Sequence, residues 1–222
     1  MSISETVPKR RLFAQFAAVA RALGHEHRLE LLEALAQSER SVEALAARAG
    51  QSVANTSQHL QQLRRAGLVD TRREGKHVIY RLKGDAVLAL ITALQQVAER
   101  NLAEVQQIVA TYFTSRDSLD AISRQDLLRR LAEGDVIVLD VRPEDEFASG
   151  HVPGAINIPV AALNREMASL PREKEIVAYC RGPYCVLSFD AIEALRSQGF
   201  RVRRLEDGFP EWKAAGLTVE VA

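Results

Sequence analysis

Apolar side chains recur every three or four residues through the first third of the chain. This spacing predicts one helix over residues 11–23 and a second after the stretch 24–28. Ser41 and Ser52 each stand directly before a new apolar period, which is the position of a helix-capping residue. The chain is therefore expected to open with four helices.

Beyond these helices the period of the pattern changes. Residues 68–82 read as two short strands joined by a charged turn at Gly75. A helical pattern follows over about 84–113, and its apolar stripe is too long for a module of this size to cover alone. Together with Phe13 and Phe16, we expect this helix to form a dimer interface.

The polar segment 114–119 predicts a linker, after which β-branched runs alternate with helical patterns. The runs at 136–140, 176–179 and 202–205 predict strands, and helices are expected near 123–132, 160–168 and 187–198. We expect a mainly α winged helix-turn-helix with a β-hairpin wing over residues 1–115. Residues 118–222 are expected to form a three-layer α/β domain with a parallel sheet.

Composition narrows the class of protein. A hydrophobic content of 47% and a charged content of 26% are ordinary for a globular protein. The sequence shows no secretory signal and no membrane-length apolar run, so we expect a cytoplasmic protein that does not contact membranes. Net charge is zero, but the first 115 residues hold 15 Lys and Arg against 11 Asp and Glu. This surplus weakly favours a polyanionic partner for the first domain.

The helix that starts at Ser52 carries side chains that can read DNA bases. Its candidate contacts are Ser52, Asn55, Thr56, Ser57, Gln58, His59 and Gln62, with Val53, Leu60 and Leu63 expected to pack inward. Candidate phosphate contacts are Arg64, Arg65, Arg72, Arg73 and Lys76. Taken singly, these are also the features of a generic polar helix and a solvated hairpin. Their order along the chain favours duplex DNA as a partner.

Residues 15–82 resemble the ArsR/SmtB family of winged-helix repressors. The resemblance rests on LGHEHRLELL at 23–32, TSQHLQQLRRAGLV at 56–69 and REGKHVIYRL at 73–82. It implies a homodimer that binds a partly palindromic operator and releases it with an inducer. The metal ligands of metal-sensing members are missing, because 41–48 has no cysteine and 84–113 has no histidine. We interpret His25 and His27 as capping or exposed, and we expect no metal and no cofactor.

Cys180 and Cys185 are the only cysteines, which excludes a disulfide network and a four-cysteine zinc site. Between them lie Arg181, Gly182, Pro183 and Tyr184. A loop between a buried strand and a helix can direct backbone N–H groups and a helix dipole at Cys180, and Arg181 adds a cation. We expect these to lower the pKa of the Cys180 thiol and make it reactive. The alternative is a buried, inert cysteine.

The second half of the chain resembles single-domain rhodaneses. The resemblance rests on LDVRPEDEFASGHVPGAINIP at 139–159 and GFPEWKAAG at 208–216. It implies that Cys180 takes a sulfane sulfur from thiosulfate or polysulfide and holds it as a persulfide stabilised by loop N–H groups. Asp140, Arg142, Glu146 and His151 belong to this signature. We interpret them as scaffold, with an active-site role for Arg142 as the minor alternative.

Cys185 stands where rhodaneses commonly have arginine. The change removes a cation for thiosulfate but supplies a thiol that could resolve a Cys180 persulfide into a bridge. Alternatively, Cys185 points into the core.

Three functions remain open at this stage. The first is a transcriptional regulator, expected to repress, whose rhodanese domain senses sulfane sulfur or redox state. The second is a sulfurtransferase whose winged helix serves dimerisation or promoter localisation. The third is an arsenic-responsive repressor, for which each chain offers only two thiols.

Overall fold

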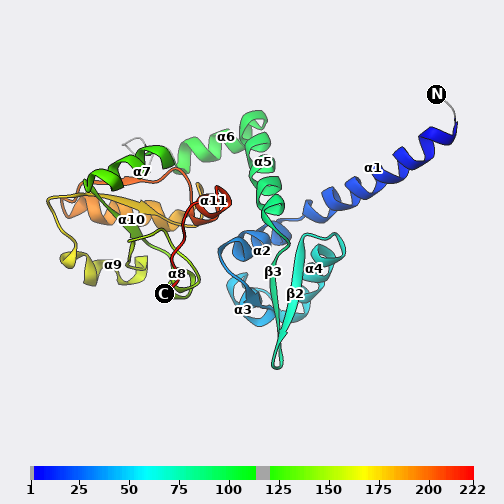
Figure 1. Ribbon diagram of the computed structural model, residues 1–222, viewed down its shortest axis with the longest axis horizontal. Coiled ribbons are helices and arrows are strands. Elements are labelled where there is room, and N and C mark those ends of the chain that lie inside the picture. The colour runs from blue at the N-terminus through cyan, green and yellow to red at the C-terminus, as the bar shows by residue number, and fades with distance from the viewer. Residues whose placement is uncertain (1–2, 114–120) are drawn as a thin grey trace. The chain divides into compact units, whose positions relative to one another are not determined.

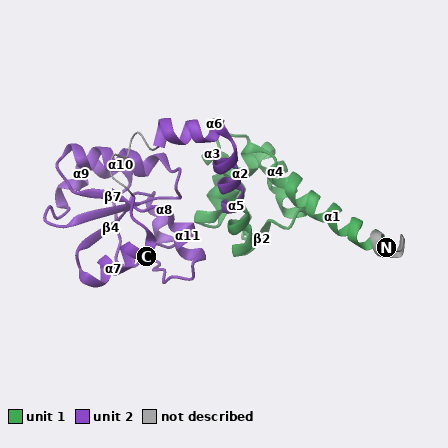
Figure 2. Ribbon diagram, turned by 90° about the horizontal axis from the view of Figure 1, so that it is seen from above, with its two compact units in different colours: residues 1–91 green, residues 92–222 purple. Residues whose placement is uncertain are grey.

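The computed structural model describes residues 3–113 and 121–222. It divides into two compact units, Met1–Ile91 and Thr92–Ala222 (Figure 2). This division falls earlier than the boundary predicted from sequence, near residue 115, and the predicted linker 114–119 lies outside the described residues. None of the helices in the described ranges has both the length and the hydrophobicity of a membrane span.

The first unit has the predicted helices followed by a hairpin (Figure 1). The elements are α1 (Ile3–Leu23), α2 (Glu26–Gln37), β1 (Arg40–Ser41), α3 (Val42–Arg48), α4 (Val53–Arg65), β2 (Val69–Glu74) and β3 (His77–Leu82). The strands are antiparallel in the order β1-β3-β2. The prediction missed only β1, which is too short to show a period.

Local capping sets where α3 and α4 begin. The Ser41 hydroxyl accepts a hydrogen bond from the Ala44 N–H, and the Ser52 hydroxyl accepts one from the Asn55 N–H, both at 3.2 Å. These bonds satisfy N–H groups that have no partner inside the helix. Both predicted caps are therefore confirmed. The helices pack around a core of leucines that includes Leu32, Leu45, Leu60 and Leu63.

The long helix expected over 84–113 is broken, so this prediction was wrong. α5 (Asp85–Asn101) ends where Leu102 adopts an extended conformation (φ −107°, ψ 111°). The Asn101 side-chain amide donates to the Val97 carbonyl at 2.8 Å and helps to end the helix. A second helix, α6 (Ala103–Ile108), and a π-helix (Val109–Phe113) follow. Apolar spacing continues across the break and therefore does not reveal it.

The second unit contains a four-stranded parallel sheet in the order β5-β4-β6-β7. Its strands are β4 (Val136–Asp140), β5 (Ile156–Asn157), β6 (Glu175–Tyr179) and β7 (Val202–Arg204). The α-helices around this sheet are α7 (Arg124–Glu133), α8 (Glu144–Ala148), α9 (Val160–Glu166), α10 (Val186–Ser197) and α11 (Phe209–Ala214). The predicted strands and helices are all present, and β5, α8 and α11 were missed.

Alternation along β6 separates the two faces of this sheet. Ile176 and Ala178 belong to the core cluster that contains residues of α9 and α10. Val177 and Tyr179 belong to the cluster that contains residues of α7 and α11. Because successive strand residues point to opposite faces, helices must cover both sides. The predicted three-layer α/β architecture is confirmed.

A buried ion pair lies at the carboxyl end of β4. Asp140 and Arg142 have fully buried side chains, and the Arg142 guanidinium donates to the Asp140 carboxylate at 2.6 Å and to the Gly150 carbonyl at 2.8 Å. The Tyr179 hydroxyl also donates to Asp140. Burial lowers the pKa of Arg142, but the hydrogen bonds and charge of Asp140 outweigh it, so the pKa is raised overall. The Arg142 guanidinium therefore stays charged.

We expect Arg142→Met to lower the free energy of unfolding by about 3–5 kcal/mol, because it leaves the Asp140 carboxylate buried without its cation. Urea unfolding followed by the fluorescence of Trp212, the only tryptophan, measures this in the same unit. Arg129→Met on α7 is the matched control, since its ion pairs are exposed and screened by solvent, and its loss should be far smaller. Equal losses in the two variants would contradict the assignment.

Candidate functional site

The exposed face of α4 carries most of the predicted base-reading residues. Ser52, Asn55, Gln58 and Gln62 are exposed and Ser57 is half-buried. Two predictions were wrong in orientation, because Thr56 and His59 are buried on the helix face that also holds Leu60 and Leu63. Val53, expected to pack inward, is exposed at the first position of the helix. The helix turns its first residue away from the core that its later turns enter.

Arg28 is a buried residue of this module that sequence reasoning missed. Its guanidinium donates to the Gln62 amide oxygen at 2.6 Å and to the Arg21 carbonyl at 2.9 Å. It also donates to the Ala22 carbonyl near the end of α1. Arg28 therefore ties α1 and α2 to α4 and sets the orientation of one predicted DNA-contacting amide. A lone arginine in a helical pattern carries no sequence signal of these partners.

Three histidines pack together beside α4. The ring centroid of His59 lies 4.5 Å from that of His25 and 5.8 Å from that of His27. His25 is the residue that precedes α2, but its side chain makes no capping hydrogen bond, and both His25 and His27 are half-buried. Burial, followed by the charges of His25 and Arg28, lowers the pKa of His59. In the described residues, no group of three or more histidine, cysteine, aspartate or glutamate side chains is arranged to hold a metal ion.

The wing presents a mixture of paired and exposed cations. Arg72 lies 2.8 Å from Glu39 and 2.6 Å from Glu74, and hydrogen bonds to these carboxylates raise its pKa. Arg73 and Lys76 are exposed on either side of the turn, where Gly75 has φ 58°. Arg64 and Arg65 are exposed in the last turn of α4. Arg72 is thus the phosphate candidate that already binds two carboxylates of this unit.

The two cysteines form a disulfide across the loop between β6 and α10. Their Cα atoms are 6.2 Å apart, within the usual range for a disulfide. Both residues are buried, Cys180 to 2% exposure, and both belong to the core cluster on the α9 and α10 face. Cys185 thus lies in the core and is bonded to Cys180 at the same time.

Arg181 does not supply the cation that was expected beside Cys180. Its guanidinium binds the carboxylate of Glu146 through hydrogen bonds of 2.8–3.1 Å, and the Glu146 side chain is fully buried. A carboxylate at this distance cancels most of the positive charge that a thiolate would experience. Arg181 instead fastens the loop to α8. The sequence could not show this, because its partner lies 35 positions away.

Arg142 lies in the core, below the surface at which a sulfur donor would arrive. Its side chain is fully buried and is bound to Asp140 and Gly150. The minor alternative of an active-site role is therefore not supported by its position. The interpretation of Asp140 and Arg142 as partners at the end of the strand agrees with these contacts. His151, in turn, stacks on the ring of Phe147 at 3.7 Å and bonds its carbonyl.

The start of α11 and the glycine before it pack against the loop of residues 180–185, called here the thiol loop. The Phe209 N–H donates to the Cys180 carbonyl at 3.0 Å. A Cβ atom on Gly208 would lie 2.2 Å from the Gly182 nitrogen and 2.4 Å from the Arg181 carbonyl carbon. The loop backbone therefore packs directly on a backbone that only glycine permits. Gly208 belongs to the rhodanese-like sequence motif at 208–216, but the motif does not indicate this contact with the loop backbone.

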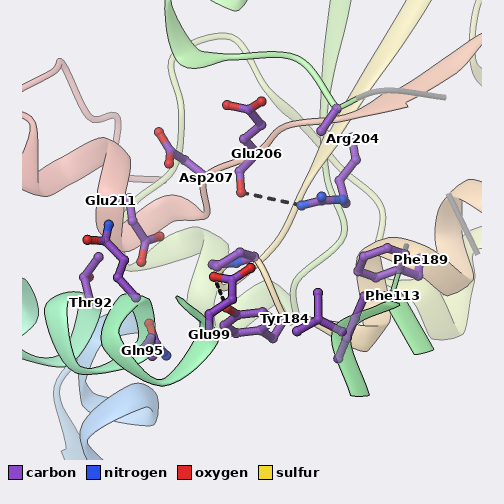
Figure 3. A pocket seen from close by; sticks show the side chains of 14 residues that line it. Thr92, Gln95, Glu99, Phe113, Tyr184, Phe189, Arg204, Glu206, Asp207 and Glu211 are labelled. Carbon is purple, nitrogen blue, oxygen red and sulfur yellow. Dashed lines mark hydrogen bonds between the residues drawn. The ribbon is translucent and has the colours of Figure 1, made fainter. Parts of the chain in front are cut away.

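Tyr184 joins the thiol loop to α5. Its hydroxyl donates to the Glu99 carboxylate at 2.8 Å, and Figure 3 shows this bond beside the rings of Phe113 and Phe189. Burial, with the hydrogen bond and charge of Glu99, raises the pKa of Tyr184 to about 12. The phenol therefore stays protonated and remains a donor. Sequence reasoning placed Tyr184 in the loop but did not identify Glu99.

Comparisons with known proteins also divide the chain into two domains. Residues 23–72 match the model of a helix-turn-helix domain, and residues 123–215 match the model of a rhodanese-like domain. An HTH-type transcriptional regulator from Mycobacterium tuberculosis is 46% identical over 96% of this chain and 93% of its own length. The chain belongs to this family of HTH-type transcriptional regulators. The predicted combination of an ArsR-type winged helix and a rhodanese-like domain is confirmed.

Partial relatives of the regulator match one half each. A sulfurtransferase from Allochromatium vinosum is 32% identical over 46% of this chain and 94% of its own length. The homodimeric winged helix-turn-helix DNA-binding domain of a Mycobacterium bovis protein is 42% identical, covering 43% of this chain and 89% of that one with a TM-score of 0.41.

We expect Gly208→Ala to destabilise the second unit by about 3 kcal/mol or more, because the new methyl group meets backbone atoms that cannot rotate away. Urea unfolding followed by Trp212 fluorescence measures the loss. Gly182→Ala is the control from the facing strand of backbone, where the nearest atom is 4.0 Å from the added carbon, and it should change stability by less than about 0.5 kcal/mol. A tolerated Gly208→Ala would show that the loop is not held in this way.

Proposed function

We propose that this regulator senses sulfane sulfur through the Cys180–Cys185 pair and thereby changes its affinity for operator DNA. The observation that carries the proposal is the disulfide in the rhodanese-like loop of a chain that also contains a DNA-binding fold. The proposed domain limits are 1–115 for DNA binding and dimerisation and 118–222 for sulfur chemistry. The relative from Allochromatium vinosum, named a sulfurtransferase, supports sulfur as the signal.

The proposed chemistry proceeds in two balanced steps. The Cys180 thiolate attacks the sulfane sulfur of a polysulfide, forms a Cys180 persulfide and releases the shortened polysulfide. The Cys185 thiolate then attacks the inner sulfur of that persulfide and expels hydrosulfide. Two thiols are oxidised to the disulfide, and the transferred sulfur is reduced. A Cys180–Cys185 disulfide is the expected product of these two steps, so the disulfide between these residues supports the proposal.

The charges around the loop favour sensing over turnover of thiosulfate. Cys185 replaces an arginine that rhodaneses commonly carry, and Arg181 is bound to Glu146. A dianionic donor would therefore meet little compensating charge at the loop. A nearby second thiol also ends the cycle by removing the persulfide before an external acceptor can take it.

α5 offers a route from the loop to the DNA-binding fold. Val87 and Ile91 in its first half are buried in the core of the first unit. Glu99 in its second half accepts the hydrogen bond from Tyr184, the residue next to Cys185. We propose that making or breaking the disulfide moves Tyr184 and biases this shared helix.

The proposed DNA interface uses the exposed side of α4 and the wing. Base contacts are assigned to Ser52, Asn55, Ser57, Gln58 and Gln62, and phosphate contacts to Arg64, Arg65, Arg73 and Lys76. Thr56 and His59 would support the helix from inside. We propose that polysulfide releases the DNA, which makes the regulator a repressor.

Fluorescence anisotropy on the regulator's own upstream DNA, at fixed salt, tests this function. We expect polysulfide to weaken binding by a factor of about 5–150, the usual range for coupled sites, and a reductant to restore it. Cys180→Ser should abolish the response. Cys185→Ser should still accept one sulfur on Cys180, seen by mass spectrometry, while DNA stays bound.

Two results would decide against sensing. Tight DNA binding that polysulfide does not change would mean that the regulator responds to a different inducer. Steady-state thiosulfate:cyanide turnover that Cys180→Ser abolishes would favour the sulfurtransferase alternative.

Tyr184→Phe separates the sulfur chemistry from its coupling to DNA binding, because it keeps both thiols and removes only the bond to Glu99. It should form the disulfide normally but release DNA less.

A second copy of the chain is the proposed partner of α1. Residues 7–17 of this helix are all exposed, including Phe13 and Phe16 at 57% and 56%. A helix of this length with so few contacts gains little stability alone in water, and its aromatic pair is an exposed apolar surface. Pairing with a second copy would bury it, as expected for a reader of palindromic DNA.

We expect Phe16→Glu to shift the regulator from dimer to monomer in sedimentation equilibrium, because the carboxylate cannot be buried against a second apolar helix. DNA affinity should fall with it. Gln15→Glu adds the same charge at the neighbouring exposed position and should leave the dimer intact. A dimer that survives Phe16→Glu would place the interface elsewhere.

A further inference from the structure

A pocket of about 420 Å³ lies beside the thiol loop, entirely within the unit Thr92–Ala222 (Figure 3). Pro183 and Tyr184 line it from the loop, and the second half of α5 lines it from another side. The segment between β7 and α11 closes a further side. This volume lies in the range of pockets that hold small organic molecules.

Aromatic rings form one part of the pocket. The ring of Phe113 lies 5.6 Å from that of Tyr184 and 5.3 Å from that of Phe189, measured between centroids. Aromatic faces attract organic cations within about 6 Å. The protein already uses this wall in that way, because the Arg204 guanidinium lies 4.9 Å from the Phe189 centroid.

The polar lining is predominantly negative. Its charged residues are the carboxylates of Glu99, Glu206, Asp207 and Glu211 and the guanidinium of Arg204. Arg124 lies 3.4 Å from Asp207 and compensates part of this charge. Even with both arginines counted, carboxylates outnumber guanidinium groups by two to one. An anion would be repelled here, whereas an amine would find charge partners and ring faces together.

We propose that this pocket binds a small organic amine, and that its occupancy is linked to the state of the Cys180–Cys185 pair. The amine lies against the aromatic wall and makes ion pairs with Glu99 and Glu206. The binding itself is independent of the proposed sulfur sensing; only the linkage rests on it. The ligand thereby gives the regulator a second input besides sulfur.

The linkage follows from Tyr184 and Glu99, which belong to both the pocket and the loop contact. Tyr184 immediately precedes Cys185, and its bond to Glu99 exists in the disulfide state described here. Reduction frees the loop to move Tyr184 and so changes the pocket wall. The amine therefore binds the disulfide form more tightly, and by reciprocity it favours the disulfide over the dithiol.

Isothermal titration calorimetry of the full chain with putrescine, at 150 mM salt, tests the proposal. We expect saturable one-to-one binding to the oxidised protein, and no measurable binding of butane-1,4-diol, which has the same length without the charges. Glu206→Gln and Glu99→Gln should each weaken binding about tenfold or more, because each removes a charged partner. Reduction of the disulfide should weaken it about fivefold or more.

Glu104→Gln on α6 is the matched control, since Glu104 is exposed and does not line the pocket. It should leave the affinity unchanged. Equal binding of the diol, or equal weakening by Glu104→Gln and Glu206→Gln, would overturn the site. Equal affinity in the oxidised and reduced protein would overturn the linkage. Neither result depends on the DNA response to polysulfide, so failure of the site and failure of sulfur sensing are distinguishable.

Discussion

The position of the thiol loop depends on the buried carboxylate of Asp140, at the end where the parallel strands finish. Asp140 terminates β4 and binds Arg142 and Tyr179, and Tyr179 is the last residue of β6 before Cys180. Asn157 at the end of β5 adds hydrogen bonds to the backbone carbonyls of Asp140 and Arg142 at 3.0 and 2.9 Å. Three strands are thus fixed at one edge by a single polar cluster. Such a cluster is stable only when every member is paired, which is why its members act as one unit.

The loop built on this edge differs from a sulfur-transferring one in its charges. Arg181 is occupied by Glu146, and a second cysteine stands at the end of the loop. The cations that would hold an anionic donor are replaced by an anchor and a thiol. The same scaffold would therefore suit the proposed response, which ends in an intramolecular bond. The proposed amine ligand of the pocket lined by Tyr184 would carry a charge opposite to that of the proposed sulfur donor.

The sequence predicted features that depend on neighbours along the chain. The bounds of β4, the caps at Ser41 and Ser52, and the three-layer order all follow from period and local chemistry. The sequence-based predictions failed where a side chain binds a partner distant in the chain, or where a structural change leaves no trace in the hydrophobic pattern. His59 looked exposed because it is polar, but it packs against His25, and the break at Leu102 leaves the apolar spacing intact. Arg181 was expected to act on the Cys180 thiol. Its actual partner, Glu146, lies 35 positions away along the chain, so the sequence pattern could not connect the two.

The burial of both cysteines has a consequence for how the disulfide is reset. Cys180 is 2% exposed and Cys185 is 7% exposed in the disulfide state, so a reducing thiol can reach the bond only when the loop opens locally. Openings of this kind are rare events with their own free energy, and the reaction rate scales with how often they occur. Under the proposed mechanism, a disulfide formed during a brief supply of sulfur would therefore outlast that supply. The regulator would keep a short record of its recent exposure.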